Sequence, residues 1–203
     1  MIPSADRPTE RLQFGWQDVY VLRHGESTFN ARQDREVDPI DFDARLTDRG
    51  REQAATVASQ IRVLAPNLIV TSPLTRALQT AEIIACGRVP VLVEPLIREW
   101  KLNSCDIGRP VSMLRREFPE FSFDHLAETW WYEGDDGESP NPKGVIVEPR
   151  TLFLDRVHRF RQWLQQHPGK CIVMVGHNAF IIHLTRRKLG NCELISLTGQ
   201  RCL

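Results

Sequence analysis

Four short apolar runs, each followed by a helical pattern or a loop, constrain the fold of this chain more than any other feature. The runs are Val19 to Leu22, Leu68 to Thr71, Val91 to Val93 and Cys171 to Val175. Their alternation with helical segments predicts an α/β fold with three layers, in which helices flank a mostly parallel central sheet. A last apolar run, Leu194 to Leu197, is compatible with an added edge strand.

Amphipathic segments between these runs predict four helices. They begin at or near Thr47, Pro73, Phe153 and Ala179, and they end near Pro66, Gly87, Pro168 and Gly190. Thr47 is a good N-cap, and proline is favoured in a first turn. A helix that begins at Pro73 carries Arg76 in its first turn, where free N–H groups favour an anion.

Length and composition indicate a globular chain. The 203 residues, of which 41% are hydrophobic, suit one domain. We expect residues 1–17 to form a flexible arm and residues 18–203 to form a single domain. The irregular stretch inside about 100–150 breaks the strand and helix rhythm, and we expect a lid there.

Charge and motif content exclude several classes of protein. Basic and acidic residues number 26 each, so no overall field attracts nucleic acid or an anionic membrane. The N-terminus lacks the features of a secretory signal, and no apolar run approaches the ~20 residues that span a bilayer. Five cysteines show no disulfide or zinc pattern. We expect a cytoplasmic protein without metal or cofactor, and a homodimer is compatible with the sequence.

Polar residues follow the predicted strands at the point where each strand ends. Arg23 and His24 follow the first strand, Arg76 the second, Glu99 the third and His177 the fourth. Ligands of open parallel sheets bind at the carboxyl ends of the strands. We therefore expect these five side chains to meet at one edge of the sheet.

These residue types suit the cleavage of a phosphate ester through a phosphohistidine. A neutral imidazole is a competent nucleophile near neutral pH, so His24 can attack phosphorus without a metal. Arginine forks and a second histidine can hold the phosphoryl oxygens. A carboxylic acid must protonate the leaving alkoxide, and Glu99 is the candidate for that role.

The stretch Leu22 to Asn30, LRHGESTFN, resembles the Arg-His-Gly-Glu signature of the histidine phosphatase, or phosphoglycerate mutase-like, superfamily. Leu46 to Gly50, Thr71 to Ala77 and Val175 to His177 match further motifs in the same order. The resemblance extends over roughly residues 18 to 185, with little to recognise between about 110 and 148. It implies the fold described above and an enzyme that needs no metal.

The resemblance also implies a role for each matched residue. His24 corresponds to the phosphorylated nucleophile, and the phosphate-binding residues correspond to Arg23, Asn30, Arg76 and His177. Glu99 corresponds by order to the proton donor, within a short motif, and Asp106 is the alternative acid. Asn178 departs from the family, in which glycine commonly follows the second histidine.

The sequence thus predicts a metal-independent phosphomonoester hydrolase that acts on a small phosphorylated metabolite. Two alternatives stay open. One is a phosphoglycerate mutase-type phosphotransferase, although Arg98 to Lys101 does not continue into the mutase motif. The other is a catalytically silent protein that binds a phosphorylated ligand. A metal site at His24 and His177 is disfavoured because the neighbouring arginines would repel a cation.

Overall fold

The computed structural model describes residues 18–32, 38–135 and 137–197. Its centre is a five-stranded sheet in the order β3-β2-β4-β1-β5. The strands are β1 (Asp18–Arg23), β2 (Leu68–Thr71), β3 (Val91–Val93), β4 (Cys171–Gly176) and β5 (Leu194–Ser196). All neighbouring pairs are parallel except β1 and β5. The expected flexible arm, residues 1–17, lies outside the described residues.

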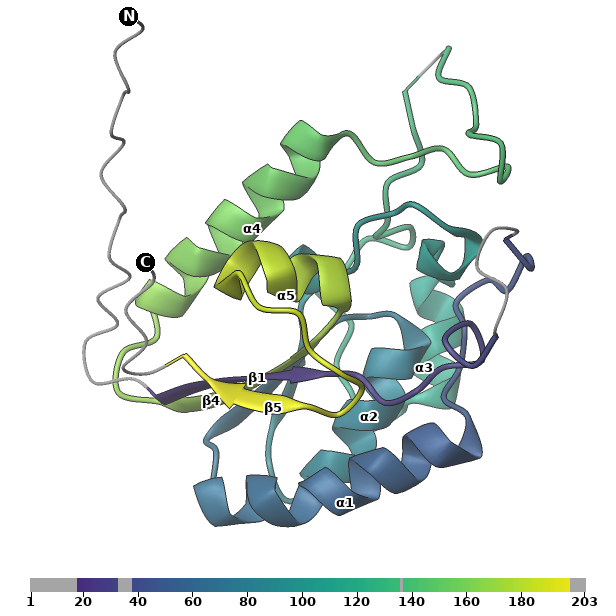
Figure 1. Ribbon diagram of the computed structural model, residues 1–203. Helices are drawn as coiled ribbons and strands as arrows, with labels where there is room; N and C mark the ends of the chain where they lie inside the picture. The colour runs from purple at the N-terminus through teal and green to yellow at the C-terminus, as the bar shows by residue number, and fades with distance from the viewer. Residues whose placement is uncertain (1–17, 33–37, 136, 198–203) are drawn as a thin grey trace, which may run out of the picture.

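Helices cover both faces of the sheet, with α4 and α5 on one face and α1 and α2 on the other (Figure 1). The helices are α1 (Asp48–Leu64), α2 (Thr75–Ala85), α3 (Val111–Glu117), α4 (Arg150–Gln165) and α5 (Asn178–Thr185). Two 3-10 turns, η1 (Pro95–Ile97) and η2 (Ser104–Asp106), follow β3. The predicted three-layer α/β fold is confirmed. None of the helices described is long and apolar enough to cross a bilayer.

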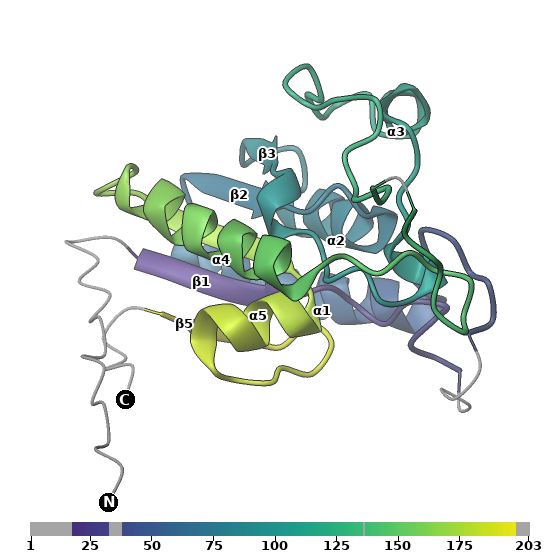
Figure 2. The ribbon, with the colours of Figure 1, turned by 90° about the horizontal axis from the view of Figure 1, so that it is seen from above.

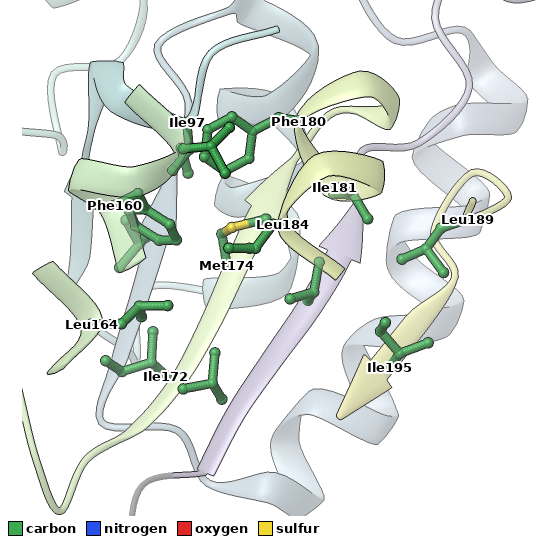
Figure 3. Close-up of a cluster of buried hydrophobic side chains, with 14 of the residues drawn as sticks. Ile97, Phe160, Leu164, Ile172, Met174, Phe180, Ile181, Leu184, Leu189 and Ile195 are labelled. Atoms are coloured by element: carbon green, nitrogen blue, oxygen red, sulfur yellow. The ribbon is translucent and has the colours of Figure 1, made fainter. Parts of the chain in front are cut away.

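The central strand β4 is buried on both faces, which explains its unbroken apolar sequence. Ile172 and Met174 pack with Phe180 in the core beneath α4 and α5 (Figure 3). Val173 and Val175 point to the opposite face and pack in the core formed with α1 and α2. Because neighbouring side chains of a strand alternate in direction, one strand joins both cores.

Contacts that the sequence pattern does not show set two helix boundaries apart from the predicted ones. Helix α2 begins at Thr75 rather than Pro73, because Leu74 is still extended and the Thr75 N–H is bound by the carboxylate of Asp43 at 2.8 Å. Helix α5 ends at Thr185 rather than near Gly190, because Arg186 adopts a left-handed conformation with φ of 60°. The other predicted end points agree with α1 and α4 to within a few residues.

The segment 100–150 lies beyond the carboxyl ends of the parallel strands, as Figures 1 and 2 both show. It contains η2 and the unpredicted helix α3. Trp130 anchors it by packing with Leu74, Leu78 and Val111, and its Nε1 donates to the Arg109 carbonyl at 3.0 Å. The segment is therefore partly built into the core.

Candidate active site

The register of β1 against β4 brings the two predicted site histidines together. Arg23 is paired with Gly176, and the N–H of His24 donates to the Gly176 carbonyl at 3.0 Å. The next residues along both strands are His24 and His177, whose ring centroids lie 5.0 Å apart. Both are buried, with 3% and 0% of their surface exposed. A single small anion can contact both rings.

Hydrogen bonding and charge prepare His24 as a nucleophile. Its Nδ1 lies 2.7 Å from the Gly25 carbonyl, which can only accept, so Nδ1 carries the proton. The lone pair is then on Nε2. Burial, followed by the charges of Arg76 and Arg23, holds the pKa of His24 well below its usual value. The ring is neutral at pH 7.

His177 and its neighbour present buried polar atoms without a partner. Neither ring nitrogen of His177 has a hydrogen-bond partner among the described residues, and the same holds for Oδ1 of Asn178, the first residue of α5. Burial, then Arg76, lowers the pKa of His177 well below its usual value. Buried polar groups are rarely left unpaired, so these atoms point to a ligand.

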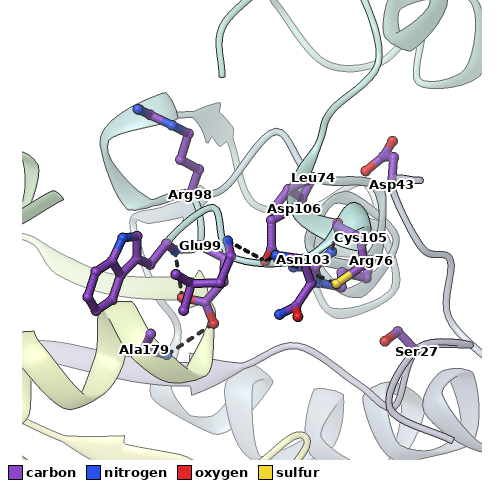
Figure 4. A network of polar contacts seen from close by, with 12 residues as sticks. Ser27, Asp43, Leu74, Arg76, Arg98, Glu99, Asn103, Cys105, Asp106 and Ala179 are labelled. Carbon is purple, nitrogen blue, oxygen red and sulfur yellow. Dashed lines mark hydrogen bonds and ion pairs between the residues drawn. The ribbon is translucent and has the colours of Figure 1, made fainter. Parts of the chain in front are cut away.

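Arg76 is a buried cation that is held by the η2 turn. It is the second residue of α2, with Nη1 donating to the Cys105 carbonyl at 2.6 Å and Nη2 to Asp106 Oδ1 at 2.9 Å (Figure 4). A guanidinium has more N–H groups than these bonds use, so it can still bind an anion. Its charge also acts on both histidines.

Arg23 and Asn30 are held near His24 by other hydrogen bonds. Arg23 Nη1 donates to the Leu189 carbonyl at 2.9 Å. The Asn30 Oδ1 accepts from Asn191 Nδ2 at 3.2 Å, and the same amide donates to the His24 carbonyl at 3.0 Å. Asn30 is therefore tied to the backbone of the nucleophile through Asn191.

The loop that carries His24 packs against the start of α1 with no space for side chains. A Cβ on Gly25 would lie 2.4 Å from the Gly50 carbonyl oxygen, and one on Gly50 would lie 2.0 Å from that of Glu26. The N–H of Glu26 donates to Gln53 Oε1 at 2.9 Å, and that of Gly25 donates to Thr80 Oγ1 at 3.1 Å. The motif residues outside the site thus hold this loop in place.

Glu99 lies at the N-terminus of α5, next to His177, which is the N-cap of that helix. Its Oε2 accepts from the N–H of Ala179 at 3.0 Å (Figure 4), and its Oε1 accepts from that of Phe180 at 3.2 Å. Burial, followed by the charge of Asp106, raises the pKa of Glu99. A carboxyl with a raised pKa can retain its proton for transfer.

Asp106, the alternative acid, makes a different set of contacts. One oxygen forms the buried ion pair with Arg76, and the other accepts from the N–H groups of Leu102 and Asn103 at 3.3 and 3.1 Å. These bonds fix Arg76 to the η2 turn. The structure therefore brings together all five predicted polar residues, and Asp106 lies between Arg76 and Glu99 (Figure 4).

Sequence reasoning missed a second buried network, behind the start of α2. Asp43 binds the N–H of Thr75 and also accepts from Arg109 Nε at 2.8 Å. Arg109 Nη2 donates to Thr75 Oγ1 at 2.5 Å. The network fixes the turn of helix that carries Arg76. Thr75 belongs to a motif that the sequence analysis matched, so its importance could be seen in the sequence. Nothing in the sequence near Asp43 marks that residue as the partner of Thr75.

The chain is similar to known proteins over most of its length. Residues 19–194 match the model of the histidine phosphatase superfamily, branch 1. A probable phosphoglycerate mutase of Cronobacter sakazakii is 42% identical, over 85% of this chain and 74% of that protein. The wheat 2-carboxy-D-arabinitol-1-phosphatase is 31% identical over 85% of this chain, which spans only 32% of that longer protein.

Solved structures agree on the fold. A mycobacterial glucosyl-3-phosphoglycerate phosphatase, in complex with VO3, matches with a TM-score of 0.60 and 23% identity, covering 90% of this chain and 91% of its own. The ecdysone phosphate phosphatase of the silkworm, in complex with tungstate, matches with a TM-score of 0.61 and 16% identity, covering 90% of this chain and 89% of its own. At these identities the likeness is one of architecture.

Proposed function

The chain belongs to the histidine phosphatase superfamily and is an enzyme of the phosphatase type, and we propose that it hydrolyses phosphomonoesters through a phosphohistidine at His24. One observation carries the proposal. A neutral His24 ring lies beside His177, whose ring nitrogens have no partner in the described structure, and both lie within the field of Arg76. Such a site matches a tetrahedral anion.

The phosphoryl group binds first, in this proposal. Arg23, Arg76 and His177 donate to its non-bridging oxygens through charge-assisted hydrogen bonds, and Asn30 adds a polar contact. The fixed positive charge then stabilises the charge that develops on the transferring group. The substrate is a small phosphorylated metabolite, and residues 100–150 form a lid over it within a single domain of residues 18–203.

The chemistry proceeds in two displacements. His24 Nε2 attacks phosphorus in line, the P–O bond breaks, and Glu99 gives its proton to the leaving oxygen. Glu99, now ionised, takes a proton from water while the water oxygen attacks phosphorus. The N–P bond breaks, which releases inorganic phosphate and restores neutral His24 and protonated Glu99. The Gly25 carbonyl holds the Nδ1 proton throughout.

The rival reading as a mutase shares the first displacement but returns the phosphate to a product. Incubation with 3-phosphoglycerate and with a panel of phosphomonoesters separates the two, with inorganic phosphate and isomerised product measured together. Hydrolysis predicts phosphate release on the panel without isomerisation. Isomerisation that exceeds phosphate release would replace the proposal, and binding without either reaction would favour a silent phospholigand-binding protein.

The pH dependence of hydrolysis follows from the two shifted groups. Catalysis needs neutral His24 and protonated Glu99. Because the pKa of His24 is lowered by burial and Arg76, activity persists below the usual histidine pKa of about 6.5. Because the pKa of Glu99 is raised by burial and Asp106, the acid works above the usual value of about 4.3, and activity falls as pH rises through the raised value.

This dependence is measured as kcat/KM for an alkyl phosphate over a pH series. An aryl phosphate with a good leaving group is the control, because its first displacement needs little proton transfer and its alkaline decline should be weaker. An alkyl phosphate rate that instead rises through about 6.5, as an unperturbed histidine would give, contradicts the assignment.

A further inference from the structure

We propose that Arg156 is a positioning residue that holds Glu99 in the orientation needed for proton transfer. The inference rests on the proposed role of Glu99 as the acid and adds a residue from a distant helix. Arg156 lies on α4 and is buried, with 4% of its surface exposed. It does not belong to any motif in the resemblance, and the catalytic cycle leaves its buried charge without a function.

Arg156 binds the backbone of the segment that carries Glu99. Its Nη1 donates to the carbonyls of Leu96 and Arg98 at 2.5 and 3.0 Å, and its Nη2 lies within 3.3 Å of the carbonyl of Glu99 itself. This segment comprises η1 and the turn that follows it, and no strand of the described residues pairs with these carbonyls. One guanidinium therefore supplies the hydrogen bonds that regular structure would supply elsewhere.

A buried carboxylate fixes the guanidinium in turn. Glu148, 1% exposed, accepts from Arg156 Nε at 2.8 Å and from Nη2 at 2.6 Å, which is the two-pronged geometry that orients an arginine plane. Its Oε1 also accepts from Arg98 Nη2 at 2.7 Å, and its carbonyl accepts from Trp100 Nε1 at 2.8 Å. The residues on both sides of Glu99 are thus held by the same pair.

Glu99 is consequently clamped at two ends. Arg156 holds its backbone, while the first N–H groups of α5 hold its carboxylate. Figure 4 shows the Arg98 side chain directed away from that carboxylate, so the neighbouring positive charge lies outside the site. Because a displacement of about 1 Å at a catalytic group can cost on the order of 10²-fold in rate, the clamp matters to catalysis as well as to folding.

The test is a double-mutant cycle with Arg156→Gln and Glu99→Gln, read on one alkyl and one aryl phosphate. Arg156→Gln should lower kcat/KM for the alkyl phosphate by roughly 10- to 100-fold and for the aryl phosphate by much less. Phosphohistidine should accumulate, because the misplaced carboxylate activates water poorly. In the Glu99→Gln background, Arg156→Gln should lower kcat/KM for the alkyl phosphate by less than about a further 3-fold, since the effects of coupled residues are not additive.

Controls separate positioning from a general structural role. Arg159→Gln, on the exposed face of the same helix, should leave kcat/KM unchanged for both substrates. Arg156→Lys keeps a cation against Glu148 but loses the two-pronged guanidinium, so it should show a smaller loss of kcat/KM that is again greater for the alkyl phosphate. This variant replaces Arg156→Gln in the test if the glutamine variant fails to fold. Equal losses on both substrates, or equal losses in both backgrounds, overturn the proposal. If Glu99→Gln lowers kcat/KM equally for the alkyl and the aryl phosphate, the assignment of Glu99 as the acid is refuted instead.

Discussion

Replacing His24 with alanine is expected to abolish turnover and phosphoenzyme together, with kcat falling by at least about 10⁴-fold. The imidazole forms the bond to phosphorus, and its Nε2 lone pair is available because Nδ1 is hydrogen-bonded to the Gly25 carbonyl. The measurement combines phosphate release with trapping of acid-labile, base-stable phosphoprotein. Phosphate binding should survive in part, because Arg23, Arg76 and His177 remain.

His158→Ala is the matched control for this experiment, since that histidine is exposed on α4 and is hydrogen-bonded to Gln162 of the same helix at 2.9 Å. It should leave turnover and phosphoenzyme unchanged. A His24→Ala protein that folds, binds phosphate and retains more than about a tenth of the activity would refute the covalent mechanism.

Glu99→Gln is expected to lower kcat/KM for alkyl phosphates by about 10²- to 10⁴-fold, the usual contribution of a general acid. Glutamine keeps an oxygen that can accept from the first N–H groups of α5, but it has no acidic proton to transfer. An aryl phosphate should lose far less in its first displacement, because its leaving group departs as a stabilised anion. The measurement is the ratio of the two losses, together with the lifetime of phosphohistidine.

Asp106→Asn discriminates between the two candidate acids. Its carboxylate holds Arg76, so we expect similar losses on alkyl and aryl phosphates, as for a residue that orients a phosphate ligand. If Asp106→Asn shows the strong leaving-group dependence and Glu99→Gln does not, the roles of the two residues must be exchanged.

The sheet could be predicted from the sequence because burial on both faces leaves a plain signal. The runs that begin at Leu68 and Val91 coincide with β2 and β3, and those at Val19 and Cys171 lie within β1 and β4. The weak run at Leu194 is indeed an edge strand, but its antiparallel direction follows from the loop that returns to β1, which carries no such signal. Apolar periodicity reports burial rather than direction.

Helix ends were harder, since distant contacts decide them. Arg186 takes a left-handed conformation usually given to glycine or asparagine, and the turn is held by Thr185 Oγ1, which accepts from the N–H of Arg187 at 3.0 Å. Leu189 is then buried in the core. Local propensity favours a longer helix, and tertiary packing shortens it.

The polar residues of the site were predictable because each follows a strand, and the strands end at one edge. Their supporting residues were not. Asp43 binds Thr75, which lies 32 residues away in the sequence. Arg156 binds Glu148, 8 residues away, and the carbonyl of Arg98, 58 residues away. No spacing rule connects such partners, so only coordinates reveal which buried charges hold the site together.

The position of β4 has a consequence for the newborn chain. In the sheet this strand lies between β2 and β1, although it is made long after both. When the ribosome has synthesised β1, β2 and β3, the strand that pairs with both β1 and β2 is therefore still missing. The apolar strands β1 and β2 then have unpaired edges. The nascent protein must keep these strand edges from pairing with foreign strands until β4 emerges, which delays assembly of the sheet and defines a period of exposure to aggregation.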